Sequence, residues 1–271
     1  MTKRIIVGYD DSGPSRRALE WALSRAAKER TPVLLAHVHP GGAASDAEVG
    51  AAVAEEAAAA ARQRHPEQSI LARVLDGDVV SALLDLVTPD DVLVIGTHKT
   101  GHLHGRSLGT TGLALATAAP CTVVVVPDMD LRFRRGVVAG IDARPDAVDV
   151  SEAAAIEAER RGDELVLIRA GSPDFADTDP LAVEGGRLQD AHPALPVSCR
   201  TTSRAVAPTL LDAALGHALL VIGARHPSEI RAGHVSAVLH DVLINLTAPV
   251  LVARHGGSGS HARSHLMKET A

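Results

Sequence analysis

One stretch of this chain occurs twice, and that repeat constrains the fold more than any other feature. Residues 5–10, Ile-Ile-Val-Gly-Tyr-Asp, return as Val-Val-Ala-Gly-Ile-Asp at 137–142, an offset of 132 residues (from 5 to 137). Residues 92–96, Val-Leu-Val-Ile-Gly, return as Leu-Leu-Val-Ile-Gly at 219–223, an offset of 127 residues (from 92 to 219). Repeats at this spacing predict two copies of one domain in tandem.

The first copy alternates short apolar runs with helical patterns. Its predicted strands are about 4–9, 32–39, 69–75, 91–96 and 121–126. Its predicted helices are about 15–29, 45–64, 79–87 and 109–118. Strands that are apolar throughout are typical of a parallel sheet covered on both faces. The sequence therefore predicts an α/β fold of two tandem doubly wound domains, Rossmann-like or flavodoxin-like, each with a five-stranded, mainly parallel sheet and helices on both faces.

The second copy repeats this alternation. Its predicted strands are about 136–142, 164–169, 197–202, 219–223 and 250–253, and its predicted helices about 147–161, 181–191, 208–215 and 234–245. We expect a first domain over 1–128, a linker over 129–135 and a second domain over 136–254. The tail at 255–271 is rich in Gly, Ser and His and is predicted to be disordered.

Composition excludes several classes of protein. The formal net charge is −6 and there is no long basic tract, so nucleic acid is not an expected partner. No apolar run reaches membrane-spanning length and no signal peptide is recognisable, so we expect no membrane partner. The two cysteines, Cys121 and Cys199, occupy non-equivalent positions in the two copies, which indicates a reducing cytoplasm rather than a disulfide framework.

The first candidate binding segment follows the first strand, because ligands of open parallel sheets bind at the carboxyl ends of strands. It contains Gly8 and Asp10, and the Asp10 carboxylate can accept a hydrogen bond from a base amine or a ribose hydroxyl. The alternative is a helix cap, in which Asp11 or Ser12 opens the next helix with Pro14 in the first turn.

A glycine-rich loop at 96–111 joins the fourth strand to the fourth helix. Its glycines let backbone amides approach an anion, and the amides and hydroxyls at the helix start suit phosphate, although many such loops are only turns. Three histidines in the loop, at 98, 102 and 104, have no Cys or carboxylate nearby, so a solvated loop is favoured over a metal site. At the end of the second strand, Val38 backbone groups can read an adenine edge, or simply end the strand.

Together these segments resemble the universal stress protein family, over nearly the whole chain and in two tandem copies. The opening at 6–12, the helix segment at 18–22 and the last strand at 119–127 carry the resemblance. Nucleotide-binding members of the family have Gly, two residues, Gly, nine residues, Gly, then Ser or Thr. Gly96, Gly109 and Thr110 match this pattern, and Lys99 occupies the second glycine position.

The resemblance implies that Asp10 and Val38 lie where the family contacts adenosine, and Gly8 is predicted to bind the nucleotide beside them. It implies phosphate contacts at Gly96, Gly109, Thr110 and Thr111. Lys99 either blocks close approach of the backbone or pairs its ammonium with a phosphate.

The second copy departs further from the family pattern. His226, Ser236 and Ala237 replace its last three loop positions, while Gly223 and Asp142 remain. This is the pattern of a copy that no longer binds nucleotide.

The resemblance implies a cytoplasmic stress-response protein that binds ATP or a related adenine nucleotide in its first domain. We expect it to act by ligand-dependent regulation or by binding an unidentified regulatory protein, not as a dedicated catalyst. Two alternatives stay open: a nucleotide-independent interaction module and a slow ATPase. No protein ligand set for a metal is evident, so magnesium would arrive with the ATP. The apolar last strands at 123–126 and 250–252 are predicted to pair within one chain as a pseudo-dimer, with a homodimer as the alternative assembly.

Overall fold

The computed structural model describes residues 3–41, 44–97, 110–142, 147–171, 179–224 and 236–254. The first half alternates strand and helix. Its strands are β1 (Ile5–Gly8), β2 (Val33–His39), β3 (Ile70–Asp76), β4 (Val92–Thr97) and β5 (Thr122–Pro127). Its helices are α1 (Gly13–Glu29), α2 (Ala44–Arg64), α3 (Val79–Leu86) and α4 (Thr110–Ala118).

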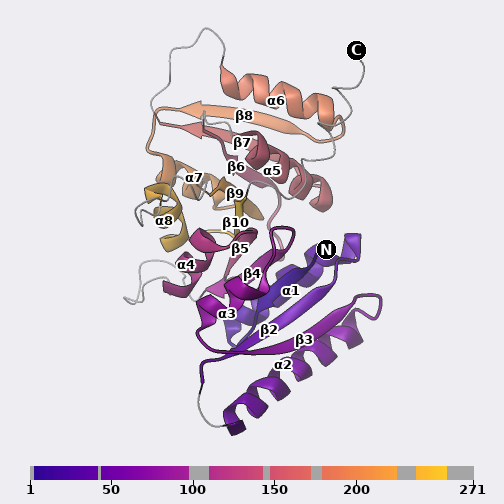
Figure 1. Ribbon diagram of the computed structural model, residues 1–271. Helices are drawn as coiled ribbons and strands as arrows, with labels where there is room; N and C mark the ends of the chain where they lie inside the picture. The colour runs from indigo at the N-terminus through magenta and orange to yellow at the C-terminus, as the bar shows by residue number, and fades with distance from the viewer. Residues whose placement is uncertain are drawn as a thin grey trace, which may run out of the picture.

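The second half has the same order of elements. Its strands are β6 (Val137–Gly140), β7 (Leu165–Ala170), β8 (Val197–Thr202), β9 (Leu219–Gly223) and β10 (Val250–Ala253). Its helices are α5 (Ala147–Arg161), α6 (Pro180–Ala191), α7 (Val206–Ala214) and α8 (Ala237–Ile244). The predicted fold class, two tandem doubly wound α/β domains, is confirmed (Figure 1). The tail at 255–271 lies outside the described residues.

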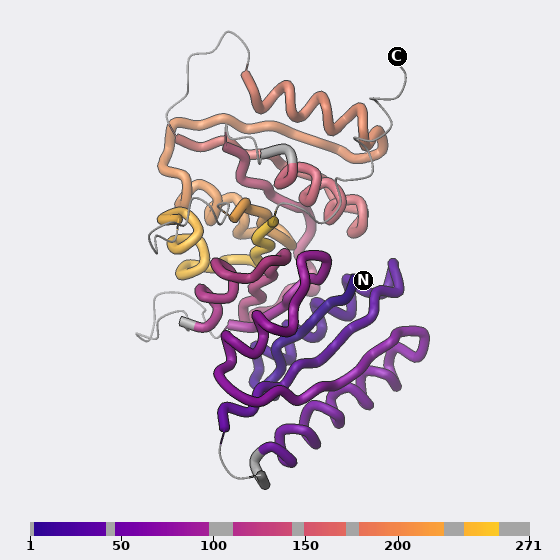
Figure 2. Tube along the Cα trace, viewed as in Figure 1, coloured from indigo at the N-terminus to yellow at the C-terminus, as the bar shows by residue number. Residues whose placement is uncertain are grey.

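The two halves share one ten-stranded sheet, in the order β3-β2-β1-β4-β5-β10-β9-β6-β7-β8. Every neighbouring pair within a half is parallel. The junction between the halves is antiparallel: β5 pairs with β10, with Val125 opposite Val250 and Val123 opposite Val252. The chain can be followed in Figure 2 from the first half into the second, across this junction. The predicted pairing of the two last strands is therefore present.

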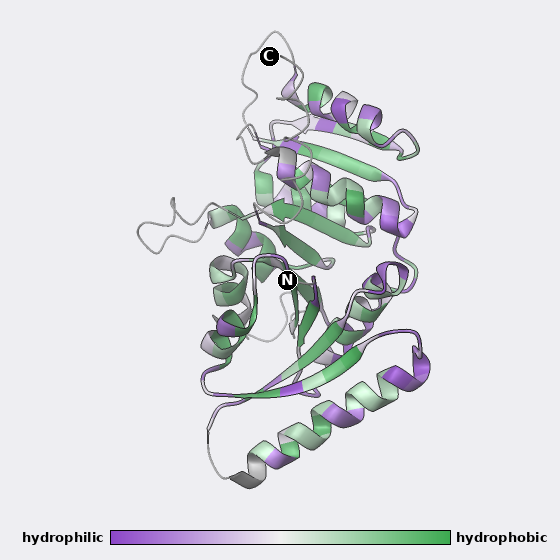
Figure 3. Ribbon diagram, turned by 45° about the vertical axis from the view of Figure 1, so that its right-hand side comes forward, coloured by the Kyte–Doolittle hydropathy of each residue, from purple (hydrophilic) through white to green (hydrophobic). Residues whose placement is uncertain are grey.

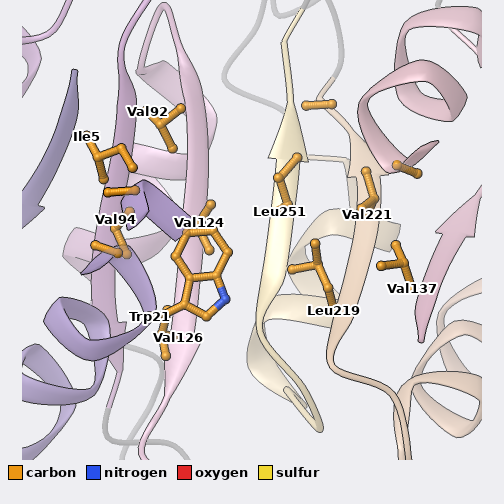
Figure 4. Packing of buried hydrophobic residues seen from close by; sticks show 14 of the residues in the cluster. Ile5, Trp21, Val92, Val94, Val124, Val126, Val137, Leu219, Val221 and Leu251 are labelled. Carbon is orange, nitrogen blue, oxygen red and sulfur yellow. The ribbon is translucent and has the colours of Figure 1, made fainter. Parts of the chain in front are cut away.

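The sheet has a core on each face. Helices α1, α2, α5 and α6 cover one face, and α3, α4, α7 and α8 cover the other. Successive β5 residues alternate between the cores, so that Val124 and Val126 join the first and Val123 and Val125 the second. Figure 3 shows strands that are largely hydrophobic and outer helices with mixed surfaces. In Figure 4 the ring of Trp21, the single tryptophan, lies beside Val124 and Val126.

Helix α1 has clear local causes for its bounds. The Ser12 hydroxyl accepts a hydrogen bond from the Ser15 amide at 3.3 Å, and Pro14 lies in the first turn. The helix ends at Glu29, and the next residue, Arg30, adopts a left-handed conformation with φ 51°. Gly162, 132 positions later, adopts the same conformation after α5, with φ 70°. The offset of 132 therefore holds through the first strand and helix of both halves.

Candidate functional site

The first half has the topology that creates a ligand crevice. Strand β1 has β2 and β3 on one side and β4 and β5 on the other, so the order of connection reverses between β1 and β4. In open α/β sheets, ligands bind at the carboxyl edge beside such a reversal. The strand ends at this point are Gly8 and Thr97, and the turn from Tyr9 to Ser12 leads directly from β1 into α1.

Asp10 is exposed in this turn and has one carboxylate oxygen engaged. Its Oδ1 accepts hydrogen bonds from the Ser12 amide at 3.1 Å and the Ser12 hydroxyl at 2.6 Å. Partial burial acts to raise the pKa of Asp10, but hydrogen bonds from Ser12 and Ser15 outweigh it and lower the pKa below its usual value. Both Ser12 contacts engage Oδ1. Asp10 therefore supports the Ser12 cap and also presents an exposed carboxylate at the sheet edge.

Asp11 has a role that the sequence did not indicate. It takes a left-handed conformation with φ 61°, and its carboxylate accepts hydrogen bonds from Arg16 Nε at 2.9 Å and Nη2 at 2.8 Å. The Tyr9 hydroxyl donates to the same carboxylate at 2.8 Å. Of the two predicted caps, Ser12 is the cap and Asp11 instead holds Arg16 and Tyr9. Burial, reinforced by Asp11, raises the pKa of Tyr9 to about 12, so the phenol stays protonated at neutral pH.

The ring of His37 links β2 to this turn. Its Nδ1 lies 3.0 Å from the Tyr9 carbonyl oxygen, and because a carbonyl only accepts, Nδ1 carries the proton in this contact. On the other side, α2 passes so close that a Cβ on Gly50 would lie 2.4 Å from His37 Nε2. A lone glycine inside an alanine-rich helix is the sequence signal for such an approach. The neighbouring Val38 is half-buried against the second core.

Two glycines of the predicted site meet close neighbours in the fold. A Cβ on Gly8 would lie 3.3 Å from Ile95 Cγ2. A Cβ on Gly96 would lie 2.2 Å from the carbonyl carbon and oxygen of Pro14 and 2.7 Å from the Ser15 amide nitrogen. Gly96 is thus required for the packing of the α1 N-terminus against β4, whatever its part in binding phosphate.

The predicted phosphate loop is only partly described. Lys99, Gly109 and the three loop histidines lie outside the described residues. Thr110 and Thr111 form the first turn of α4, where Thr111 is half-buried. Among the residues that the structure describes, no group of three His, Cys, Asp or Glu side chains is placed to hold a metal ion.

The equivalent edge of the second half has different chemistry. By the offset of 132, Ile141 replaces Tyr9 and Arg169 replaces His37. Asp142 is exposed, as Asp10 is. Ser236, before α8, makes no side-chain cap hydrogen bond to that helix. The Tyr9 phenol and the His37 ring therefore have no counterpart of the same chemistry in the sequence of the second half.

Comparison with known proteins places these features in a family. The model of the universal stress protein family matches residues 1–127. Universal stress protein Rv2623 of Mycobacterium tuberculosis is 25% identical over 284 aligned residues, covering 92% of this chain and 96% of that protein. The chain belongs to the universal stress protein family. Because the second alignment spans both halves, it is a tandem member of that family, a stress protein of this type.

Other relatives agree with this assignment. Universal stress protein Rv1996 of Mycobacterium tuberculosis is 29% identical over 207 aligned residues, which are 68% of this chain and 65% of that protein. The crystal structure of a universal stress protein from Archaeoglobus fulgidus has a TM-score of 0.70 at 18% identity, covering 93% of this chain and 98% of that chain. The likeness to that structure shows the shared fold. No helix in the described ranges of this universal stress protein is long and apolar enough to cross a membrane.

Proposed function

We propose that this universal stress protein binds ATP or a related adenine nucleotide at the carboxyl edge of its first half. The observation that carries the proposal is Asp10, which presents an exposed carboxylate with a lowered pKa beside the reversal of strand order. A base amine or a ribose hydroxyl is the donor that such a carboxylate would accept from. Gly8, the last residue of β1, lies at the same edge.

The other proposed site residues would contact different parts of the nucleotide. Val38 offers backbone groups at the end of β2 to an adenine edge. Gly109, Thr110 and Thr111 would bring amides and hydroxyls of the α4 start to the phosphates, where the helix dipole also favours negative charge. The Lys99 ammonium would add a charge-assisted contact.

The proposed role of the nucleotide is regulatory, through a change in conformation or in partner binding. Two side chains of the turn itself are unsuited to act as a base at neutral pH. Tyr9 has its pKa raised to about 12, and the Asp11 carboxylate is held by Arg16. Neither Tyr9 nor Asp11 therefore supports turnover of ATP.

Titration calorimetry with ATP and magnesium tests the proposal. We expect one nucleotide per chain. Asp10→Asn keeps an acceptor for Ser12 but removes the charge, and it should weaken ATP binding by about 1–3 kcal/mol, the range for a hydrogen bond to a charged group. Asp142→Asn is the matched change in the second half and should leave binding unchanged. A stoichiometry of two, or equal effects of the two variants, would contradict the assignment to the first half.

Substitutions in the phosphate loop test the rest of the site. Gly109→Trp should abolish binding because the indole would occupy the phosphate position, while Ser236→Ala in the second half should have no effect. Lys99→Ala weakens binding by about 1–3 kcal/mol if the ammonium pairs with phosphate. Lys99→Gly strengthens binding if the side chain blocks the loop. Absence of binding heat would favour the nucleotide-independent module, and steady release of phosphate would favour the slow ATPase.

A further inference from the structure

Two oppositely charged residues at equivalent positions of the repeat face each other across the junction between the halves. Arg25 lies on α1 and Glu157 on α5, and they are 132 positions apart, which is the offset of the repeat itself. Since β5 and β10 pair antiparallel, the two halves are related by a pseudo-twofold axis at this junction. Residues that are equivalent and in contact must lie close to that axis.

Both side chains of the pair are buried. Arg25 Nε lies 2.9 Å and Nη2 2.7 Å from Glu157 Oε1, and the two side chains are 6% and 2% exposed. Arg160 bonds to the same oxygen of Glu157 and also to Glu29 of the first half. Burial acts to raise the pKa of Glu157, but Arg25 and Arg160 outweigh it and hold the pKa below its usual value.

Two further contacts across the junction are made by arginine side chains of the second half. Arg161 of α5 lies over the Trp21 ring at 5.9 Å. Arg254, directly after β10, donates to the Ala116 carbonyl at 3.0 Å and also to the Thr117 carbonyl, at the end of α4. By the offset of 127, the equivalent of Arg254 in the first half is Pro127, which has no side-chain donor. The second half therefore gives contacts to the first that the first cannot return.

We propose that the opposed charges of Arg25 and Glu157 are a pairing code, which selects the association of unlike halves and rejects the association of like halves. Two first halves meeting through this face would bury Arg25 against Arg25. Two second halves would bury Glu157 against Glu157. A buried charge whose counter-ion is removed is strongly destabilising, so either like pair loses the junction.

The exposed charged residues around this buried pair contribute less to the choice of partner. In a pair of first halves, Lys28 would take the place of Arg160 and could still reach Glu29. Both residues are exposed, and an exposed ion pair contributes little. The buried Arg25–Glu157 pair therefore determines which halves associate. The partner that this face of the first half fits is a domain with a carboxylate at the position of Glu157 and a cation at the position of Arg160.

Full-length charge variants test the code. Arg25→Glu gives a chain with two carboxylates at the axis, and Glu157→Arg gives one with two guanidinium groups. Each should lower the folding equilibrium constant by on the order of 100-fold or more, measured by urea unfolding. The double variant, Arg25→Glu with Glu157→Arg, restores opposite charges and should regain most of that loss. Arg132→Glu makes the same change of charge on a 77% exposed side chain and should have little effect.

Mixing the two single variants gives a sharper result. When the two variants are refolded together, the first half of each chain can pair with the second half of the other chain. The resulting exchanged dimer has two junctions, and each of them brings together opposite charges at positions 25 and 157. Sedimentation should show a dimer in the mixture and none in the wild type. This outcome does not require either single variant to fold alone. A mixture without dimer, or a double variant as unstable as the single ones, would overturn the pairing code.

Discussion

Replacing Gly96 by alanine tests how closely β4 and α1 are packed. The added Cβ would lie 2.2 Å from the backbone carbonyl group of Pro14 and 2.7 Å from the Ser15 nitrogen. Ordinary contacts begin at about 3.4 Å, so the start of α1 must move by roughly 1 Å or the strand must bend. Overpacking of this kind typically costs about 1–3 kcal/mol, and because the opposing atoms are backbone we expect about 3 kcal/mol.

The assay is urea unfolding followed by circular dichroism, with Gly112→Ala as the matched control. Gly112 is inside α4, and its added Cβ would lie 3.6 Å from Ile95 Cδ1, an ordinary contact. Alanine is a better helix former, so the control should stabilise the chain by about 0.5–1 kcal/mol. If Gly96→Ala unfolds within about 0.5 kcal/mol of the wild type, the close approach of Pro14 is wrong.

Three further outcomes follow from side chains elsewhere in the fold. Asp91 is buried and accepts hydrogen bonds from Arg4 at 2.7 Å and Thr88 at 2.9 Å, so Asp91→Ala should cost about 3–5 kcal/mol in urea unfolding at pH 7. Burial acts to raise the pKa of Asp91, but Arg4 and Thr88 hold the pKa below its unfolded value. The ionised Asp91 therefore stabilises the fold fully above about pH 4, and this contribution is lost as the pH falls through the folded pKa. Asp91→Ala should for this reason lose less stability than the wild type on acidification. Burial raises the pKa of Cys121 to about 11 whereas Cys199 is exposed, so a thiol reagent should label one cysteine in the folded chain and two in denaturant. Phe133 is 88% exposed, and Phe133→Ser should leave the urea midpoint unchanged.

Local patterns predicted the elements well. The predicted helix at 147–161 and strands at 197–202 and 250–253 have the observed bounds of α5, β8 and β10. The Ser12 cap and Pro14 also followed from sequence, although α1 begins at Gly13, two residues before the predicted start. These features depend on hydrophobic period, caps and proline, all of which act within a few residues. The pairing of β5 with β10 followed because an apolar edge strand needs a partner.

Long-range polar contacts could not be predicted in the same way. On a helix, Arg25 and Glu157 look like ordinary solvent-facing charges, and only the junction of the two halves buries them together. Asp11 looked like a cap because its backbone conformation and its contact with Arg16 are not encoded by spacing. Whether Lys99 helps or blocks nucleotide binding stays a prediction, since its loop lies outside the described residues.

The antiparallel junction of β5 and β10 also determines where each half can meet other molecules. All strands of the first half run with β5, and all strands of the second half run with β10, so the two halves end their strands at opposite margins of the common sheet. A small ligand at Asp10 cannot touch Asp142, and a globular partner docked at one margin leaves the other uncovered. The antiparallel junction thus separates the carboxyl edges of the two halves instead of joining them into one continuous surface.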